Sequence, residues 1–286
     1  MATPVDTTPA LRSWTLIDGE LIDPGALTIA SNDRGVTSGD GVYTTMRVVD
    51  GVPFALSRHR RRLAASLDYL GLVAADVPWE RLAGLPSELG VGDGRLRVTV
   101  TAGPGAPADP ATSPTVWATL TEVDASVPIS AVSAVTGAHP RDPERFDAGH
   151  KTLAGAANTR AVLAWAARRR GATECLYQTP AGELCEGTTT NVIVVSGARV
   201  ETPDLDTGCL PGITRQLLLE SGLVTVGELL DAHDASEADE VILTSSVRGI
   251  IPVESVDYQP LPGRNGPVWQ RLDAYWSRLR ATTHDP

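Results

Sequence analysis

Lysine is almost absent from this sequence of 286 residues. Of its 24 basic residues, 23 are arginine, and Lys151 is the single lysine. A bias toward arginine explains the 23 arginines but not the one lysine that is kept. Arginine can replace lysine as a surface cation, but it cannot lose its proton and attack a carbonyl group. Chance retention and a catalytic role for Lys151 therefore both stay open on composition alone.

Basic residues are also few beside the 35 acidic residues, which gives a net charge of -11. This balance argues against nucleic acid or an anionic membrane surface as the main partner, but it allows a small anionic substrate in a locally positive site. The apolar runs fall short of the roughly 18 residues that a membrane-spanning helix needs. We therefore expect a small-molecule substrate, no nucleic acid and no membrane partner.

Cysteine and histidine are scarce as well. The three cysteines, Cys175, Cys185 and Cys209, are odd in number and lack CxxC spacing, and no signal-peptide pattern opens the chain. These features predict a cytoplasmic protein with reduced thiols. The five histidines are scattered, without an HExxH motif or a Cys/His cluster, so we expect no metal site.

The remaining pattern mixes short strands and helices, which predicts an α+β fold. Asp-Gly turns predict hairpins at 14–22 and 41–52, and apolar spacing predicts helices at 57–72, with Ser57 as N-cap, and at 153–170. We expect two domains, over 1–121 and 150–286, joined by an interdomain strand and loop over 122–149. The Gly/Pro-rich loop 103–114 and the segment 138–149 are candidate specificity loops.

Four features predict chemistry around Lys151. Small residues follow it in KTLAGAAN, and Glu186 lies 35 positions later. A turn and helix begin at LPGIT, where free N–H groups and the Thr214 hydroxyl suit a phosphate. Three hydroxyls follow a strand at 244–246. A reactive lysine, a carboxylate and phosphate donors together point to pyridoxal phosphate (PLP).

At these residues the sequence resembles the class IV family of PLP enzymes, which includes branched-chain and D-amino-acid aminotransferases and 4-amino-4-deoxychorismate lyases. The resemblance runs from about residue 14 to 280 through an ordered set of motifs: SNDRGVTSGDGVYTTMRV, RHRRRLAASL, HKTLAGAAN, GELCEGTTTNV, CLPGITR and TSS…IPV. It implies a two-domain fold of type IV, like that of D-amino-acid aminotransferase, with a small N-terminal α/β domain and a larger C-terminal PLP-binding domain. It also implies that PLP lies between these domains and that the protein is a homodimer.

The resemblance also assigns roles by position. It makes Lys151 the Schiff-base lysine and proton shuttle, and Glu186 the partner of the pyridinium nitrogen. It places Arg62 on the cofactor phosphate and Leu210 against the ring. The remaining cofactor-binding positions are Ile213, Thr214, Ser245 and Ser246. Taken without the resemblance, these arginine, glutamate and hydroxyl positions are also compatible with ordinary surface, turn and strand-end roles.

Two departures bear on the choice of family member. The tyrosine that branched-chain members carry five residues after the lysine is Ala156 here, and we consider Asn158 as a partial substitute. Thr44 and Thr45 follow Tyr43 where branched-chain and D-amino-acid enzymes usually have a glutamate. That feature is similar to aminodeoxychorismate lyases, although a generic β-branched strand explains it equally well.

We therefore interpret the chain as a lyase that converts aminodeoxychorismate to 4-aminobenzoate, a folate precursor, and pyruvate. Lys151 and Thr45 are its expected catalytic residues, and Tyr43, Arg47 and Arg97 are its expected substrate contacts. The alternatives are a class IV aminotransferase acting on D-amino acids, branched-chain amino acids or amines, and a non-catalytic member that keeps the fold for binding.

Overall fold

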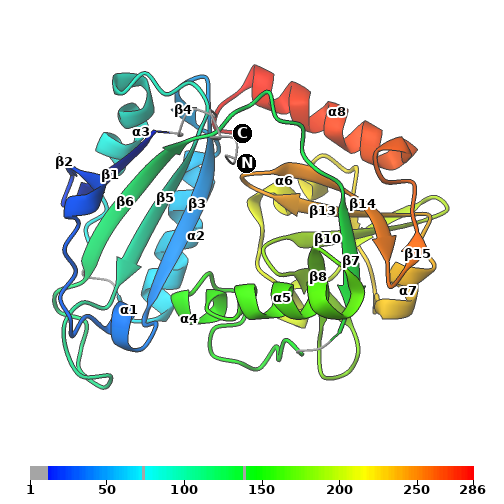
Figure 1. Cartoon of the computed structure of the whole chain (residues 1–286), viewed down its shortest axis with the longest axis horizontal. Helices are drawn as coiled ribbons and strands as arrows, with labels where there is room; N and C mark the ends of the chain where they lie inside the picture. Colours follow the sequence, from blue (N-terminus) through cyan, green and yellow to red (C-terminus); the bar gives the residue numbers. More distant parts are fainter. Residues whose placement is uncertain (1–11, 73–74, 138–139) are drawn as a thin grey trace, which may run out of the picture.

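The computed structural model describes residues 12–72, 75–137 and 140–286, with the side chains of Arg169 and Arg170 left out. The first 11 residues of the expected N-terminal domain, and residues 138–139 of the expected connection, therefore lie outside the description. Figure 1 shows two lobes, each built around one sheet. Strands and helices are mixed throughout, as the predicted α+β fold requires.

The first lobe contains an antiparallel sheet in the order β2-β1-β6-β5-β3-β4. Its hairpins include both of the predicted Asp-Gly turns, where Asp18 and Asp50 have positive φ angles and glycine follows each. The strands are β1 (Ser13–Ile17), β2 (Glu20–Ile22), β3 (Gly41–Val49), β4 (Val52–Pro53), β5 (Gly94–Thr101) and β6 (Thr115–Glu122).

Side-chain alternation gives this sheet two different faces. Apolar residues at even positions of β3 and β5, such as Val42, Met46 and Val98, pack with helices α2 (Leu56–Tyr69) and α3 (Trp79–Glu88) into one core. Residues at odd positions point to the opposite face because successive strand residues alternate. That opposite face turns toward the second lobe, and it positions the site (Figure 1).

The second lobe contains a mixed sheet in the order β12-β11-β10-β13-β14-β7-β8-β9, with β15 beside β14. β7 pairs in parallel with both β14 and β8. The strands are β7 (Val132–Thr136), β8 (Glu174–Gln178), β9 (Leu184–Gly187), β10 (Asn191–Ser196), β11 (Arg199–Thr202), β12 (Thr225–Val226), β13 (Glu240–Ser245), β14 (Gly249–Val256) and β15 (Gln259–Pro260).

Helices pack against this second sheet at two places. Ile193, Ile242 and Ile250 pack against α6 (Ile213–Glu220) and α8 (Pro267–Thr282). On another side, α5 (Thr159–Arg170) packs against β7 and β8. Phe54, which follows β4, joins the cluster of α8 and makes an edge contact with Trp276 at 5.4 Å. This contact ties the first lobe to the second.

Two sequence predictions about helices are wrong in detail. The helix expected to begin at Ser57 begins at Leu56 after Ala55, which has φ of 57°, and the Ser57 hydroxyl bonds the Asp285 carboxylate. The helix expected over 153–170 divides into α4 (Leu153–Ala156) and α5, with Asn158 between them. Propensity alone favours one continuous helix in this alanine-rich segment, but a turn at residues 157–158 interrupts it. The domain division at 122–149 stays a prediction.

Candidate active site

A cavity of about 350 Å³ lies between the two sheets. Nearly all the residues that the sequence singled out line it, although they are spread over two hundred positions. From the first lobe and the chain around α4 come Tyr43, Thr45, Arg62, Arg97 and Lys151. From the second lobe come Glu186, Leu210, Ile213, Thr214, Ser245 and Ser246. The roles assigned to them stay predictions.

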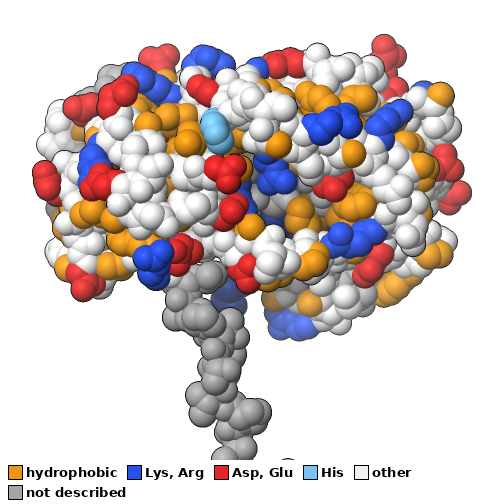
Figure 2. Space-filling view, turned by 90° about the horizontal axis from the view of Figure 1, so that it is seen from above, with side chains coloured by type: hydrophobic (Ala, Val, Ile, Leu, Met, Phe, Trp, Pro, Cys, Tyr) orange, Lys and Arg blue, Asp and Glu red, His pale blue; other side chains and the backbone are white. Residues whose placement is uncertain are grey.

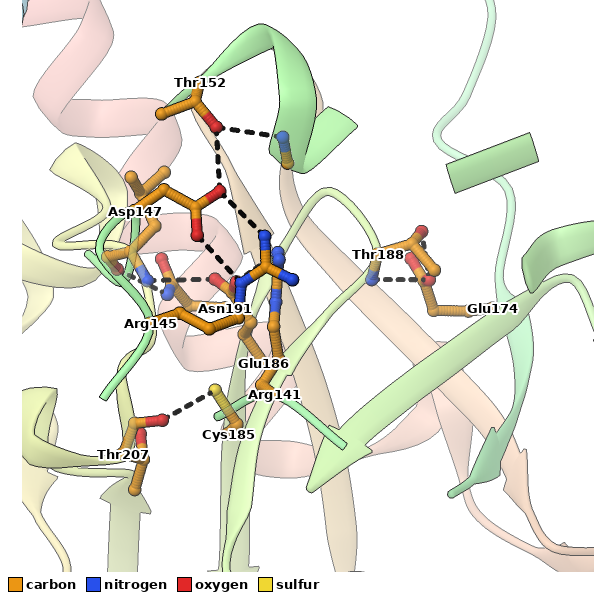
Figure 3. A network of polar contacts seen from close by, with 12 residues as sticks. Arg141, Arg145, Asp147, Thr152, Glu174, Cys185, Glu186, Thr188, Asn191 and Thr207 are labelled. Atoms are coloured by element: carbon orange, nitrogen blue, oxygen red, sulfur yellow. Dashed lines mark hydrogen bonds and ion pairs between the residues drawn. The ribbon is translucent and has the colours of Figure 1, made fainter. Parts of the chain in front are cut away.

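Lys151 lies at the joint between the lobes. Its carbonyl accepts a hydrogen bond from the backbone N–H of Tyr43 at 3.0 Å, and its Nζ lies 4.8 Å from the centre of the Tyr43 ring. The next residue, Thr152, caps α4 through Gly155 N and donates to the buried Asp147 carboxylate at 3.1 Å (Figure 3). Fixed backbone on both sides therefore aims the amine into the cavity.

The pKa of the Lys151 amine is lowered, mainly because burial disfavours its charged form, and the nearby Arg62 guanidinium lowers it further. Tyr43 and Glu186 oppose this shift without cancelling it. A lysine with a lowered pKa is a better nucleophile and a better proton acceptor near neutral pH.

This pKa shift can be measured on a single resonance. After reductive methylation with ¹³C-formaldehyde, the cofactor-free protein should show one ε-dimethylamine signal, absent in Lys151→Arg. We expect its midpoint below the ordinary lysine value of about 10.4. Because the folded chain then binds this proton more weakly than the unfolded chain, the unfolding free energy rises as pH rises through that range. A midpoint at or above the ordinary value contradicts the shift.

Alternation along β3 separates the two threonines that follow Tyr43. Thr45 lines the cavity, in register with Arg97 of β5. Thr44 is buried on the helix side, where its Oγ1 lies 2.7 Å from His59 Nδ1 and accepts a hydrogen bond from Arg62 Nη2 at 3.2 Å. The position that carries glutamate in other members therefore faces Arg62 and His59 here, and Thr45 is the threonine that faces a ligand.

Arg62 is the cation in a group of cavity donors whose chemistry suits a phosphate, here called the phosphate seat. Burial lowers the pKa of its guanidinium to about 10, and it donates to the Pro211 carbonyl at 3.4 Å as well as to Thr44. Since Arg62 donates to Thr44, the Thr44 hydroxyl is free to donate to His59 Nδ1. Burial, helped by Arg62 and Lys151, holds the pKa of His59 well below its ordinary value, so its ring is a neutral acceptor.

Hydroxyl and N–H donors complete this seat. Helix α6 begins after Gly212 without a side-chain cap, so the N–H groups of its first turn point into the cavity. The buried Thr214 and Thr244 hydroxyls have no hydrogen-bond partner within the described residues. Gly212 allows a close packing against Asn191, because a Cβ there would lie 1.8 Å from Asn191 Oδ1. Together these donors suit a dianionic group.

Glu186 supplies the carboxylate of the site. Its Oε1 accepts a hydrogen bond from Arg141 Nη2 at 2.9 Å, and its Oε2 accepts one from the Leu210 N–H at 3.0 Å (Figure 3). An ionised carboxylate has about four lone-pair sites, so both oxygens can accept a further hydrogen bond from a ligand. Arg141 therefore pairs directly with Glu186.

Two expected residues lie elsewhere. Arg47 shares the face of Tyr43 and Thr45, but it lies further along β3, past the cavity, and donates to Asp93 at 2.7 Å. Arg47 therefore does not line the cavity, and its expected contact with substrate stays a prediction. Asn158 is exposed at the start of α5 and does not line the cavity, so it does not substitute for the missing tyrosine.

The sequence interpretation missed several lining residues. They include Arg95, Arg141, His150, Thr188, Thr189, Thr190 and Arg248. Arg95 could have been predicted, because it lies two residues before Arg97 on β5 and therefore points to the same face of the sheet. Arg141 follows an irregular segment and Arg248 lies in a turn, where no periodicity marks the direction of a side chain.

The cavity has a charge opposite to that of the whole chain. Among the described residues, its lining includes Lys151 and five arginines but only one carboxylate, that of Glu186. The outer surface mixes acidic and basic side chains, as the face in Figure 2 shows. A positive cavity in an acidic protein concentrates small anions. None of the described helices is long and apolar enough to cross a bilayer, and the described residues contain no cluster of metal-ligating side chains.

Comparisons with known proteins agree with this geometry. D-alanine aminotransferase of Bacillus licheniformis is 29% identical, with 90% of this chain and 93% of the relative covered. Aminodeoxychorismate lyase of Bacillus subtilis is 27% identical, with 94% and 96% covered. A hypothetical aminotransferase from Mycobacterium tuberculosis, solved in a PLP-bound form, is 26% identical and superimposes with a TM-score of 0.79 over 94% of this chain and all of that chain.

The predicted type IV fold is confirmed by the similarity to a fold IV transaminase from Curtobacterium pusillum, which is 29% identical and superimposes with a TM-score of 0.78 over 93% of this chain and 99% of that chain. The model of the family described as amino-transferase class IV matches residues 41–256, which include Tyr43, Lys151, Glu186 and Ser246. The chain is an enzyme that belongs to the class IV aminotransferase family.

Proposed function

We propose that this enzyme is a PLP-dependent lyase that converts aminodeoxychorismate to 4-aminobenzoate and pyruvate. One observation carries the proposal: the cavity holds more guanidinium groups than the cofactor needs. Arg62 serves the phosphate seat, and Arg141 is paired with Glu186. The guanidinium groups that remain suit a substrate with two carboxylates, which aminodeoxychorismate has.

The residues present fit PLP. Arg62, the α6 N-terminus and the unpartnered hydroxyls of Thr214 and Thr244 would hold its phosphate, and Glu186 would hold a proton on its pyridine nitrogen. Leu210 would lie against the ring. When bound, PLP supplies an electron sink for the carbon that carries the substrate amine.

Three residues of the chain then have separate roles in the proposed reaction. Lys151, with its lowered pKa, accepts the proton from the amine-bearing carbon. Thr45, on the cavity face of β3, donates a hydrogen bond to the oxygen through which pyruvate departs. Arg97 stacks on Tyr43 with its guanidinium carbon 3.7 Å from the ring centre, and it binds a substrate carboxylate. Loss of pyruvate leaves an aromatic ring, which drives the reaction forward.

A second candidate is transamination of a D-amino acid. The specific observation in its favour is the 29% identity to D-alanine aminotransferase. Both reactions use Lys151 and Glu186, and they differ in where the proton is returned. A homodimer, which the resemblance implies, and a cytoplasmic location, which the cysteine pattern predicts, belong to the proposed function as well.

The two candidates differ in their products. With aminodeoxychorismate, we expect the purified holoenzyme to release 4-aminobenzoate and pyruvate in equal amounts, measured by fluorescence and by a coupled dehydrogenase. Thr45→Val should lower kcat by about 10- to 100-fold through the lost hydrogen bond, whereas the control Thr225→Val, on exposed β12, should leave it unchanged. Turnover of D-alanine with 2-oxoglutarate, without any 4-aminobenzoate, would replace the lyase with the transaminase.

A further inference from the structure

Arg248 lines the cavity from the turn that joins β13 to β14, and the reaction described above gives it no role. Its side chain is 40% exposed, and Nη2 donates a hydrogen bond to Thr189 Oγ1 at 3.1 Å. The donors on Nε and Nη1 have no hydrogen-bond partner in the described parts of the chain. One edge of the guanidinium is therefore held by protein, and the rest is available to a ligand.

The buried carboxylate of Glu174 lies beside the Arg248 guanidinium and pairs with it. Glu174 is 3% exposed at its side chain, and its Oε2 lies 3.8 Å from Arg248 Nη2. Its Oε1 accepts hydrogen bonds from Cys175 N at 3.0 Å and from both N and Oγ1 of Thr188, at 3.0 and 2.5 Å. Figure 3 shows the contacts with Thr188. These three hydrogen bonds orient the carboxylate, so Arg248 has a defined anchor.

The loop after Glu186 closes over this anchor because glycine occupies position 187. A Cβ there would lie 3.4 Å from Glu174 Cδ and 2.1 Å from Thr190 Oγ1. The loop that carries Thr188 and Thr189 is therefore packed directly on Glu174. Arg248 takes its position from this packed loop, which begins right after the cofactor carboxylate.

Arg97 presents a comparable group from the first sheet. Its guanidinium lies flat on the Tyr43 ring, and its Nε donates to Thr99 Oγ1 at 3.2 Å. No carboxylate within the described residues forms an ion pair with it. The two sheets thus each supply one preoriented guanidinium to the same cavity, and such groups bind carboxylates through paired hydrogen bonds.

We propose that Arg248 binds the second carboxylate of a dicarboxylate substrate, while Arg97 binds the first. The separation between the two guanidinium groups then selects substrates by the number and spacing of their carboxylates. Ligands with one carboxylate engage Arg97 alone. The proposal rests on the proposed function for the identity of the natural substrate, but the two-sided clamp itself applies to any dicarboxylate that binds in the cavity.

Binding to the holoenzyme tests the clamp without any turnover. Chorismate keeps both carboxylates and has a hydroxyl where the substrate has its amine, and 4-hydroxybenzoate keeps only one carboxylate. By isothermal titration calorimetry, we expect Arg248→Gln to weaken chorismate binding by about 10- to 100-fold and 4-hydroxybenzoate binding by less than about twofold. Arg248→Lys should lie between, because it keeps the charge but not the paired donors.

Matched controls separate this effect from general electrostatics. Arg199→Gln removes an exposed arginine of β11 outside the cavity, and it should bind both ligands like the parent enzyme. Unchanged chorismate binding in Arg248→Gln overturns the clamp, and so does equal weakening of both ligands. Glutarate and butyrate serve as a second pair of ligands. If aminodeoxychorismate is not converted but glutarate binding alone depends on Arg248, the clamp stands and the lyase assignment fails.

Discussion

Replacing Lys151 with alanine should abolish turnover, lowering kcat/KM by at least about 10³-fold. In the proposed function the residue would hold the cofactor and would also be the base for the substrate proton, and proton transfer alone contributes about 10²- to 10⁴-fold. The visible absorbance of the holoenzyme should change in the same variant, because the cofactor loses its attachment. Arg62 and the α6 N-terminus should still retain PLP through its phosphate.

Two companion measurements make this result specific. Lys151→Arg keeps a positive charge at the site but cannot give up its proton, so it should be as inactive as Lys151→Ala. Added methylamine should restore part of the activity of Lys151→Ala, since a small amine can accept the same proton from solution, and should not restore Lys151→Arg, whose side chain fills the space. Turnover within tenfold of the parent enzyme in Lys151→Ala would remove the lysine from the mechanism.

The second large effect concerns Glu186. Glu186→Gln should lower kcat by about 10²- to 10³-fold, because a neutral amide does not hold a proton on the pyridine nitrogen and the electron sink weakens. The substitution also leaves Arg141 without its carboxylate. Arg141 is partly exposed, so we expect a loss of only about 1–2 kcal/mol of unfolding free energy, below the cost for a fully buried pair.

A double variant separates the two effects of Glu186. Arg141→Met combined with Glu186→Gln removes the unpaired charge, so urea unfolding should recover most of the lost stability while kcat stays low. Glu183→Gln, earlier in the same chain segment and hydrogen-bonded to Thr179, is the matched control and should change neither quantity. If the double variant regains activity together with stability, Glu186 acts only through folding.

Strand alternation is the part of the site that sequence could predict best. Once β3 and β5 are assigned, parity alone separates Tyr43 and Thr45 from Thr44, and it places Arg95 beside Arg97. Arg47 shows that the face of a strand does not by itself predict whether a residue lines the cavity. It shares the cavity face, but whether a residue on that face meets the cavity depends on where the second lobe ends, and Asp93 then pairs with it.

The residues that escaped prediction come from turns and irregular segments. Arg248 and Arg141 lie where side-chain direction depends on packing between elements distant in sequence, and Glu174 acts only through the loop that covers it. The division between α4 and α5 has a similar origin, since alanine-rich sequence favours a single helix. Local pattern predicted the α+β fold and the hairpins, whereas tertiary contacts set the arginine arrangement.

The hydrogen bond from Tyr43 N to the Lys151 carbonyl has a mechanical consequence. Together with the bridge between Val42 and Thr152, it makes the lysine backbone an extra rung on the edge of the first sheet at β3. Any rotation of one lobe against the other that preserves these bonds must pivot about this rung. The Lys151 amine and the Tyr43 ring then move together, while Arg248, which lines the cavity from the second lobe, changes its distance from both. A rotation of this kind would therefore widen or narrow the cavity without separating Lys151 from Tyr43.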